Sequence, residues 1–422
     1  MQSRSTFVPM VIIGTLFFIF GFVTWLNGSL IPFLKVICDL DEFEALFVAF
    51  AFYIAYTVMA LPMSYLLDRV GYKNAMALGL IVMALGSIIF IPAALTASFI
   101  LFLMALFTMG TGLTILQSAS NPYIVYIGDI KSAARRISIM GLINKGAGVI
   151  APLMFSAFVL FNTGSLEDLS IESKNALALQ LITPYIIMAL ILVVLAALVK
   201  FSSLEDLKFT QDDEIQHKSI FEFPRLILGA VALFFYVGIE VIAGDTIGLY
   251  GQSLGVQEYT SLTSFTMSFM VFGYLCGLFF IPKYLSQEKA LLLSSLLGGL
   301  FLVGVALSST QSSAISSVLW GWSGVRTLPD SVTFVALLGF ANALVWPTIW
   351  PLAIEGLGKH TAKGSAILIM AIAGGATLPL IFGKISQVSA DMQTSYLYGI
   401  VCYIFIFLYA LKWHKILSWK KQ

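Results

Sequence analysis

Apolar runs long enough to cross a bilayer recur along this 422-residue chain and limit the folds open to it. A transmembrane helix needs about 20 mainly apolar residues to cross a hydrocarbon core about 30 Å thick. Twelve such runs are present, at 7–34, 42–67, 74–94, 98–127, 136–161, 177–201, 222–250, 259–282, 289–309, 331–356, 362–385 and 392–412. The first is too long for a signal-peptide core, so we expect it to remain as a helix. The pattern predicts an all-α membrane protein with twelve transmembrane helices.

The composition excludes several other classes of protein. Hydrophobic residues make up 59% of the chain and charged residues only 11%, which is far from the balance of a soluble domain. A net charge of +1 does not favour a nucleic-acid partner, and three cysteines do not suggest a disulfide framework. The chain has no phosphate-binding loop, so ATP is not expected to drive it. We expect no enzymatic activity, no cofactor, contact with membrane lipid and a monomeric state.

The basic residues predict the orientation of the helices. With both termini on the cytoplasmic side, 18 of the 23 Lys and Arg residues fall in inner loops or helix ends and four on the outer side. Basic residues concentrate on the cytoplasmic side of membrane proteins, so this topology is favoured over its reverse. The polar stretch 202–221 divides the chain, which predicts a first six-helix bundle at 1–201, a cytoplasmic linker, and a second bundle at 222–422.

The two halves resemble each other in sequence. Gly148–Phe155 (GVIAPLMF) is similar to Gly375–Phe382 (GATLPLIF) at an offset of 227 residues, and Pro62 matches Pro282 at an offset of 220. Similar offsets at matching places in the topology indicate a duplication. We therefore expect two pseudo-symmetric bundles.

Three charged residues, Lys145, Glu240 and Asp245, lie within apolar runs and are candidates for a functional role. Charge at membrane depth is costly, about 2.5–3.5 kcal/mol on insertion scales, and usually serves a substrate or ion pathway. Glu240 and Asp245 would point about 140° apart on a regular helix, but unwinding at nearby glycines would let them converge on one site. Lys145 can neutralise either carboxylate across the two halves or extend to the inner surface. The alternative is a structural salt bridge.

Amide and tryptophan side chains form a second group of candidates. Gln117 and Asn121 share one helical face with Thr114, and Asn342 and Trp346 are four residues apart. Amides both donate and accept hydrogen bonds, and Trp faces stack on sugar rings, so the pattern suits a neutral polyhydroxylated ligand. The alternative is that the amides bridge helices. The candidate substrate-binding residues are Trp25, Asn27, Gln117, Asn121, Asn144, Asn342 and Trp346.

A short inner loop carries a charged motif. Asp68, Arg69, Gly71 and Lys73 form it, and it looks like the inner-loop signature of the major facilitator superfamily, with Tyr72 where a basic residue is usual. Its implied role is gating, because charge pairing there holds neighbouring helix ends together. The alternative is that these charges only reflect the usual excess of basic residues in cytoplasmic loops.

Three further motifs make the resemblance specific. They are Phe22–Pro32 (FVTWLNGSLIP), Gln117–Tyr123 (QSASNPY) and Trp346–Ile349 (WPTI). The chain resembles the fucose–galactose–glucose symporter family of that superfamily, most closely its bacterial glucose/galactose branch. The resemblance covers nearly the whole chain. It implies uptake of a glucose- or galactose-type hexose by cation-coupled symport, through alternating access, across a bacterial inner membrane.

One departure from the family affects the coupling ion. Related fucose permeases carry carboxylates at the positions matching Gly28 and Gln117, so their proton site cannot be transferred here. We slightly favour Na⁺ over H⁺, with Asp245 as first ligand and Glu240 as second, because backbone carbonyls freed near Gly244 would supply further oxygens. The alternative is an H⁺-coupled or uncoupled transporter of another neutral sugar, such as fucose or an amino sugar. A membrane enzyme acting on lipid-linked sugars and a sugar-sensing receptor are disfavoured, because the three histidines lie far apart and the chain has no room for a signalling domain.

Overall fold

The computed structural model describes residues 7–127, 133–159, 170–204, 219–281, 283–357 and 360–419. Within these ranges the regular structure is helical. Twelve helical segments of the described chain are long and apolar enough to cross a membrane, which confirms the predicted fold class. The predicted linker lies mostly outside the described residues.

The first half contains six membrane-crossing segments. Because apolar runs set the helix lengths, the observed bounds follow the predicted ones within a few residues, except that the sixth segment begins earlier, at α7. The helices are α1 (Phe7–Ile37), α2 (Glu42–Ala45), α3 (Phe47–Val70), α4 (Tyr72–Thr96), α5 (Phe99–Tyr126), α6 (Ala133–Val159), α7 (Ile171–Leu179) and α8 (Ile182–Phe201).

The second half has six further segments, and several of them are broken. Proline explains one break, because Pro347 has no N–H to donate to the carbonyl of Ala343, where α14 ends. A short helix, α13, lies in the loop between α12 and α14, which hydropathy alone leaves without structure. The elements are α9 (Pro224–Asp245), α10 (Ile247–Ser253), α11 (Thr263–Phe280), α12 (Gln287–Leu307), α13 (Ala314–Trp320), α14 (Asp330–Asn342), α15 (Val345–Ile354), α16 (Thr361–Met370), η7 (Ala371–Ala373), α17 (Gly374–Ser389), α18 (Met392–Ser395) and α19 (Gly399–Leu411).

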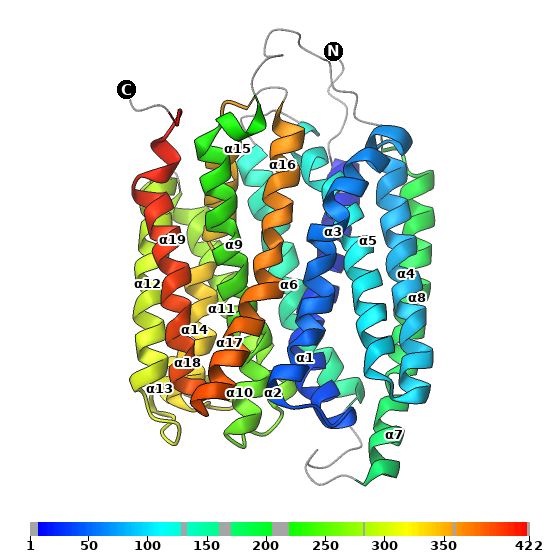
Figure 1. Ribbon diagram of the computed structural model, residues 1–422, viewed down its shortest axis with the longest axis vertical. Coiled ribbons are helices and arrows are strands. Elements are labelled where there is room, and N and C mark those ends of the chain that lie inside the picture. Colours follow the sequence, from blue (N-terminus) through cyan, green and yellow to red (C-terminus); the bar gives the residue numbers. More distant parts are fainter. Residues whose placement is uncertain are drawn as a thin grey trace.

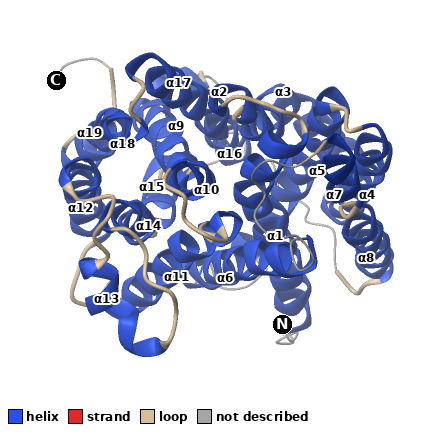
Figure 2. Ribbon diagram, turned by 90° about the horizontal axis from the view of Figure 1, so that it is seen from below, coloured by secondary structure: helices blue, strands red, loops and turns tan. Residues whose placement is uncertain are grey.

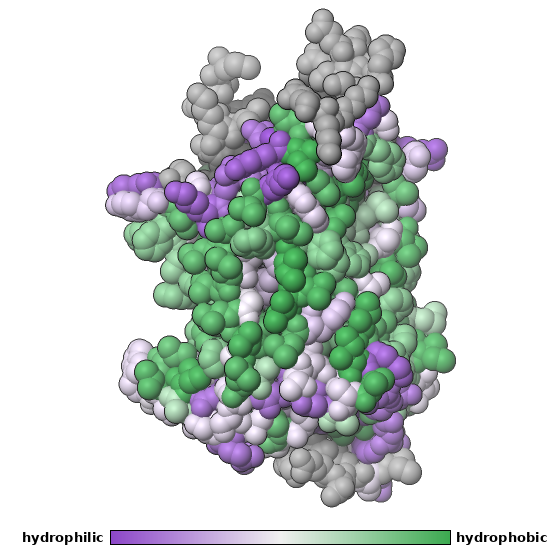
Figure 3. Space-filling view, turned by 60° about the vertical axis from the view of Figure 1, so that its left-hand side comes forward, coloured by the Kyte–Doolittle hydropathy of each residue, from purple (hydrophilic) through white to green (hydrophobic). Residues whose placement is uncertain are grey.

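The two halves stand side by side with their helices roughly parallel. In Figure 1, α1 to α8 lie mainly on the right and α9 to α19 on the left, and both termini are at the same end. Figure 3 shows a broad hydrophobic band around the middle of the visible face, with polar residues towards both ends. Exposed apolar surface of this extent marks contact with lipid.

The halves contact each other at the end away from the termini, which we call the distal end and from which Figure 2 views the molecule. Ser29 Oγ of α1 donates to the Thr260 carbonyl at 2.6 Å, and Ser156 Oγ of α6 is 2.7 Å from Thr260 Oγ1. A little deeper, Ser264 Oγ donates to the Val149 carbonyl at 2.8 Å. These contacts link α1 and α6 to the segment that follows α10, so the seam between the halves is closed there.

Candidate functional site

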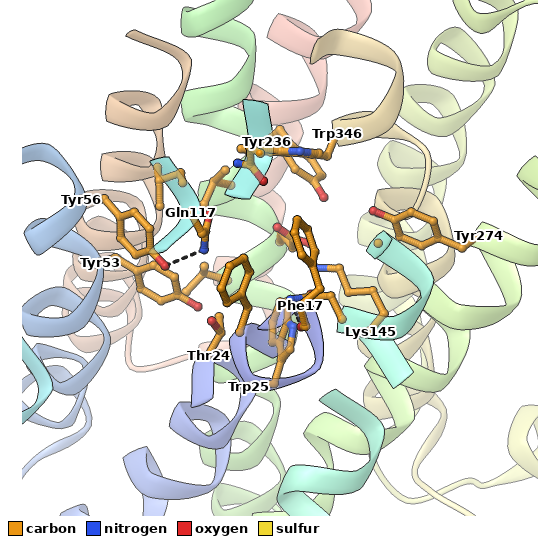
Figure 4. A pocket seen from close by; sticks show the side chains of 18 residues that line it. Phe17, Thr24, Trp25, Tyr53, Tyr56, Gln117, Lys145, Tyr236, Tyr274 and Trp346 are labelled. Carbon is orange, nitrogen blue, oxygen red and sulfur yellow. Dashed lines mark hydrogen bonds and ion pairs between the residues drawn. The ribbon is translucent and has the colours of Figure 1, made fainter. Parts of the chain in front are cut away.

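A central cavity of about 130 Å³ lies between the two halves. Its walls come from α1, α3, α5 and α6 of the first half and from α9, α11, α15 and η7 of the second. A single water needs about 10–15 Å³, so the cavity holds several waters and its polar side chains face a wet space. Figure 4 shows Tyr53 and Tyr56 on one side and Lys145 and Tyr274 on the other, with Trp346 above them.

An ion pair crosses the cavity from one half to the other. Lys145 Nζ of α6 lies 2.6 Å from Glu240 Oε1 of α9, and the two side chains are only 10% and 9% exposed. The ammonium also lies 4.4 Å from the ring centroid of Trp25. α6 is held here because α1 packs so closely at Gly21 that a Cβ would overlap the Asn144 carbonyl. Of the two predicted alternatives for Lys145, the structure shows the pairing with a carboxylate of the other half.

Asp245 is in a different environment from Glu240. It ends α9, is 0% exposed and is not among the residues that line the cavity. Tyr53 OH donates to Asp245 Oδ2 at a long 3.4 Å, and Oδ1 has no hydrogen-bond partner among the described residues. The two carboxylates do not converge on one site, because α9 stays helical through both positions and directs them to different neighbours, as expected for a regular helix.

Three of the predicted amides line the cavity. Gln117 Nε2 donates to the Tyr56 hydroxyl at 2.9 Å, and Asn144 Nδ2 donates to the Phe17 carbonyl at 3.3 Å (Figure 4 shows the first of these bonds). Asn121 follows Gln117 on the same face of α5 and also lines the cavity. These groups keep spare donors and acceptors for a ligand.

The predicted tryptophans form apolar surfaces of the cavity. Trp25 lies beneath the Lys145 ammonium, and Trp346 stacks on Trp350 with ring centroids 5.2 Å apart. The Trp346 ring is also 6.4 Å from that of Tyr236. Polar groups between aromatic surfaces suit a ligand that has hydroxyl edges and apolar faces.

Two predicted binding residues do not reach the cavity. Asn27 is buried in α1, two residues after Trp25, so it points to roughly the opposite side of the helix. Asn342 accepts a hydrogen bond from the Tyr403 hydroxyl at 2.8 Å and bridges α14 to α19. The prediction that Asn342 and Trp346 lie on one helical face required an unbroken helix. The helix is broken before α15, so the two residues do not share a face.

Sequence reasoning missed most of the aromatic wall. Tyr53, Tyr56, Tyr236 and Tyr274 line the cavity, yet in a membrane helix an aromatic residue usually indicates packing or an interface. The available signal was that Tyr53 and Tyr56 are three residues apart and present two hydroxyls on one face of α3.

The predicted gating loop joins two helices at a single residue. Gly71 has φ = 79°, a conformation that favours glycine, and links α3 directly to α4. Lys73 Nζ donates to the Ser202 carbonyl at 2.7 Å, just after α8, where a cation is favourable. Arg69 is exposed, and the side chain of Asp68 lies outside the described part of the structure. The gating role stays a prediction.

Two bundles of membrane-spanning helices around a central polar cavity are an architecture typical of transporters. The sequence profile of the Major Facilitator Superfamily matches residues 13–380, and the chain belongs to this superfamily. It is therefore a transporter and not an enzyme.

Several known proteins are similar over nearly the full length. The glucose/galactose transporter of Brucella abortus (strain 2308) is 32% identical over 404 residues, which are 94% of this chain and 92% of the relative. The L-fucose-proton symporter of Escherichia coli (strain K12) is 27% identical, over 97% of this chain and 94% of the relative. A crystal structure of the transporter FucP in the outward conformation has a TM-score of 0.73 at 24% identity, over 96% and 99% of the two chains. The family resemblance is thereby confirmed.

Proposed function

We propose that this protein imports a hexose of the glucose/galactose type by cation-coupled symport through alternating access. The observation that carries the proposal is the wet cavity on the seam between the halves, with amides on one wall, aromatic surfaces on others and an ion pair across it. The name of the Brucella abortus relative supports the choice of hexose. The name of the Escherichia coli relative supports coupling to a cation and keeps fucose as the alternative.

The chemistry of the cavity matches a neutral sugar. Gln117, Asn121 and Asn144 offer both donors and acceptors, which hydroxyl groups can satisfy in either direction. Lys145 and Glu240 neutralise each other, so the cavity presents no net charge for an ionic substrate. Trp346 supplies an apolar face for the sugar ring.

For the coupling ion, the geometry favours a proton over the Na⁺ expected from sequence. Na⁺ needs several oxygen ligands, but the carbonyls of Gly244 and Ala243 already accept hydrogen bonds from the α11 hydroxyls of Thr263 and Thr266, at 2.7 and 3.2 Å. The Asp245 carboxylate faces α3 instead, where the Tyr53 hydroxyl is its hydrogen-bond partner. A proton needs only the carboxylate, so we propose H⁺ as the coupling ion and Asp245 as its carrier.

We further propose that the protein works as a monomer in a bacterial inner membrane with both termini in the cytoplasm. The excess of basic residues on the side of the termini supports this orientation. In this orientation the closed distal end faces outward.

Counterflow in proteoliposomes tests the choice of substrate. Vesicles are loaded with an unlabelled sugar, and the entry of labelled D-galactose is followed without any ion gradient. We expect exchange with D-glucose and D-galactose inside, and little with mannitol or a hexuronate. If labelled D-galactose does not enter vesicles loaded with either D-glucose or D-galactose, while labelled L-fucose or a labelled amino sugar enters vesicles loaded with the same sugar, the hexose assignment is overturned in favour of the alternative.

A further inference from the structure

Asp245 is a buried carboxyl group with no paired cation among the described residues. The charged groups that act on it are Glu240 and Lys145, and these two are paired with each other at 2.6 Å. Its nearest polar contact is the Tyr53 hydroxyl from the other half, and one of its oxygens has no partner among the described residues. Burying an isolated carboxylate is costly, so its charge state depends on whatever donor or cation is within reach.

Tyr53 also belongs to the cavity. Its ring lines the cavity wall and stacks beside Tyr56, with centroids 6.5 Å apart at 25°, while its hydroxyl reaches Asp245. Tyr56 in turn accepts the hydrogen bond from Gln117. Three consecutive contacts therefore connect an amide proposed to bind the sugar with the buried carboxylate (Figure 4 shows the Gln117, Tyr56 and Tyr53 side chains).

We propose that Tyr53 is the positioning residue that couples cation binding at Asp245 to hexose binding in the cavity; this inference rests on the proposed symport. Tyr53 is on α3 of the first half and Asp245 on α9 of the second, so their hydrogen bond spans the seam that alternating access must open. With the distal end closed, the hydroxyl stabilises the charged carboxylate after the cation has left. When the distal end opens, the donor is withdrawn and Asp245 must take up a cation again.

The test is Tyr53→Phe, which keeps the ring in the wall and removes the hydroxyl. A hydrogen bond to a charged acceptor changes an equilibrium by about ten- to a hundredfold. We therefore expect gradient-driven accumulation of labelled D-galactose to fall at least about tenfold, while counterflow stays close to that of the wild type. Loss of coupling with retained exchange is a result that simple misfolding does not produce.

Two matched variants separate the parts of the proposal. Tyr56→Phe removes the acceptor of Gln117 and should raise the KM for sugar, with accumulation preserved at saturating sugar. Tyr185→Phe removes a buried hydroxyl with no partner among the described residues, in a ring stacked on Phe90 away from the cavity, and should change neither property.

The outcomes are distinguishable. If the wild type exchanges sugar but never concentrates it under any cation gradient, the symport proposal fails and this inference fails with it. If the wild type accumulates sugar and Tyr53→Phe accumulates it equally well, only the inference is wrong. Equal loss of exchange and accumulation in Tyr53→Phe would also overturn it, because Tyr53 would then act in sugar binding or folding. Titration calorimetry of D-galactose at two pH values gives a second reading: the wild-type Kd should depend on pH and the Tyr53→Phe Kd should not.

Discussion

Gln117 and Asn342 show how far the surroundings of an amide decide its role. Both are amides within apolar runs, and both were candidates for the same sugar site. Gln117 opens onto a wet cavity and shares its wall with Asn121. Asn342 is fully buried, and its oxygen is taken by Tyr403. Of the two amides, only Gln117 faces a space that a ligand can enter.

This contrast gives a prediction about affinity. Gln117→Ala should weaken hexose binding by about 1–3 kcal/mol, because the sugar hydroxyls lose a hydrogen-bond partner. Asn342→Ala should lower the Tm, because it removes the buried partner of Tyr403, but should leave the Kd unchanged. Isothermal titration and thermal unfolding of the two purified variants measure both effects. Equal hexose affinity in Gln117→Ala and the wild type would mean that the polar face of α5 serves helix packing and not sugar binding.

At the scale of elements, close helix contacts close the distal end. A Cβ on Gly28 of α1 would overlap the Thr263 hydroxyl, which donates to the Gly244 carbonyl at 2.7 Å. α1 therefore approaches the junction of α9 and α11 through a position that only glycine fits. Ser29, the next residue, bonds to the Thr260 carbonyl across the same seam.

Gly28→Ala should open this seam. An added methyl group in a tightly packed contact costs about 1–3 kcal/mol. Here we expect this cost to destabilise only the conformation in which the distal end is closed. The reporter is Ser29→Cys, buried in this state, in a chain whose Cys38, Cys276 and Cys402 are replaced by Ser. We expect Gly28→Ala to speed its labelling by a membrane-impermeant maleimide at least about fivefold.

The control for this prediction lies in α6. A Cβ on Gly146 meets no described atom within 4 Å, so Gly146→Ala should leave the labelling rate unchanged. Faster labelling in both variants would mean that any added methyl loosens the bundle. No acceleration in Gly28→Ala would mean that the contact at Thr263 does not hold the distal end closed.

At the scale of the whole molecule, the features that can be predicted from the sequence are those set by a local pattern of residues. Twelve spans follow from hydropathy, because a bilayer requires long apolar helices whatever their neighbours. The motifs around Trp25, Gln117 and Trp346 identify side chains that do line the cavity.

The remaining features depend on contacts between distant parts of the chain. Tyr53 and Asp245 are 192 residues apart, and no local pattern relates them. The separation of Glu240 from Asp245 depended on whether α9 unwinds, and glycines permit unwinding without requiring it. Asn27 and Asn342 were misplaced because the direction of a side chain depends on helix rotation and on the break before α15.

The central claim is that Asp245 carries the cation that drives sugar accumulation. The direct measurement is uptake of labelled D-galactose into proteoliposomes under an inward proton gradient with no sodium present, for the wild type and Asp245→Asn. The account predicts that the wild type concentrates the sugar until a protonophore collapses the gradient, and that Asp245→Asn only equilibrates it while retaining counterflow. Full accumulation by Asp245→Asn, or wild-type accumulation only under a sodium gradient, would contradict it.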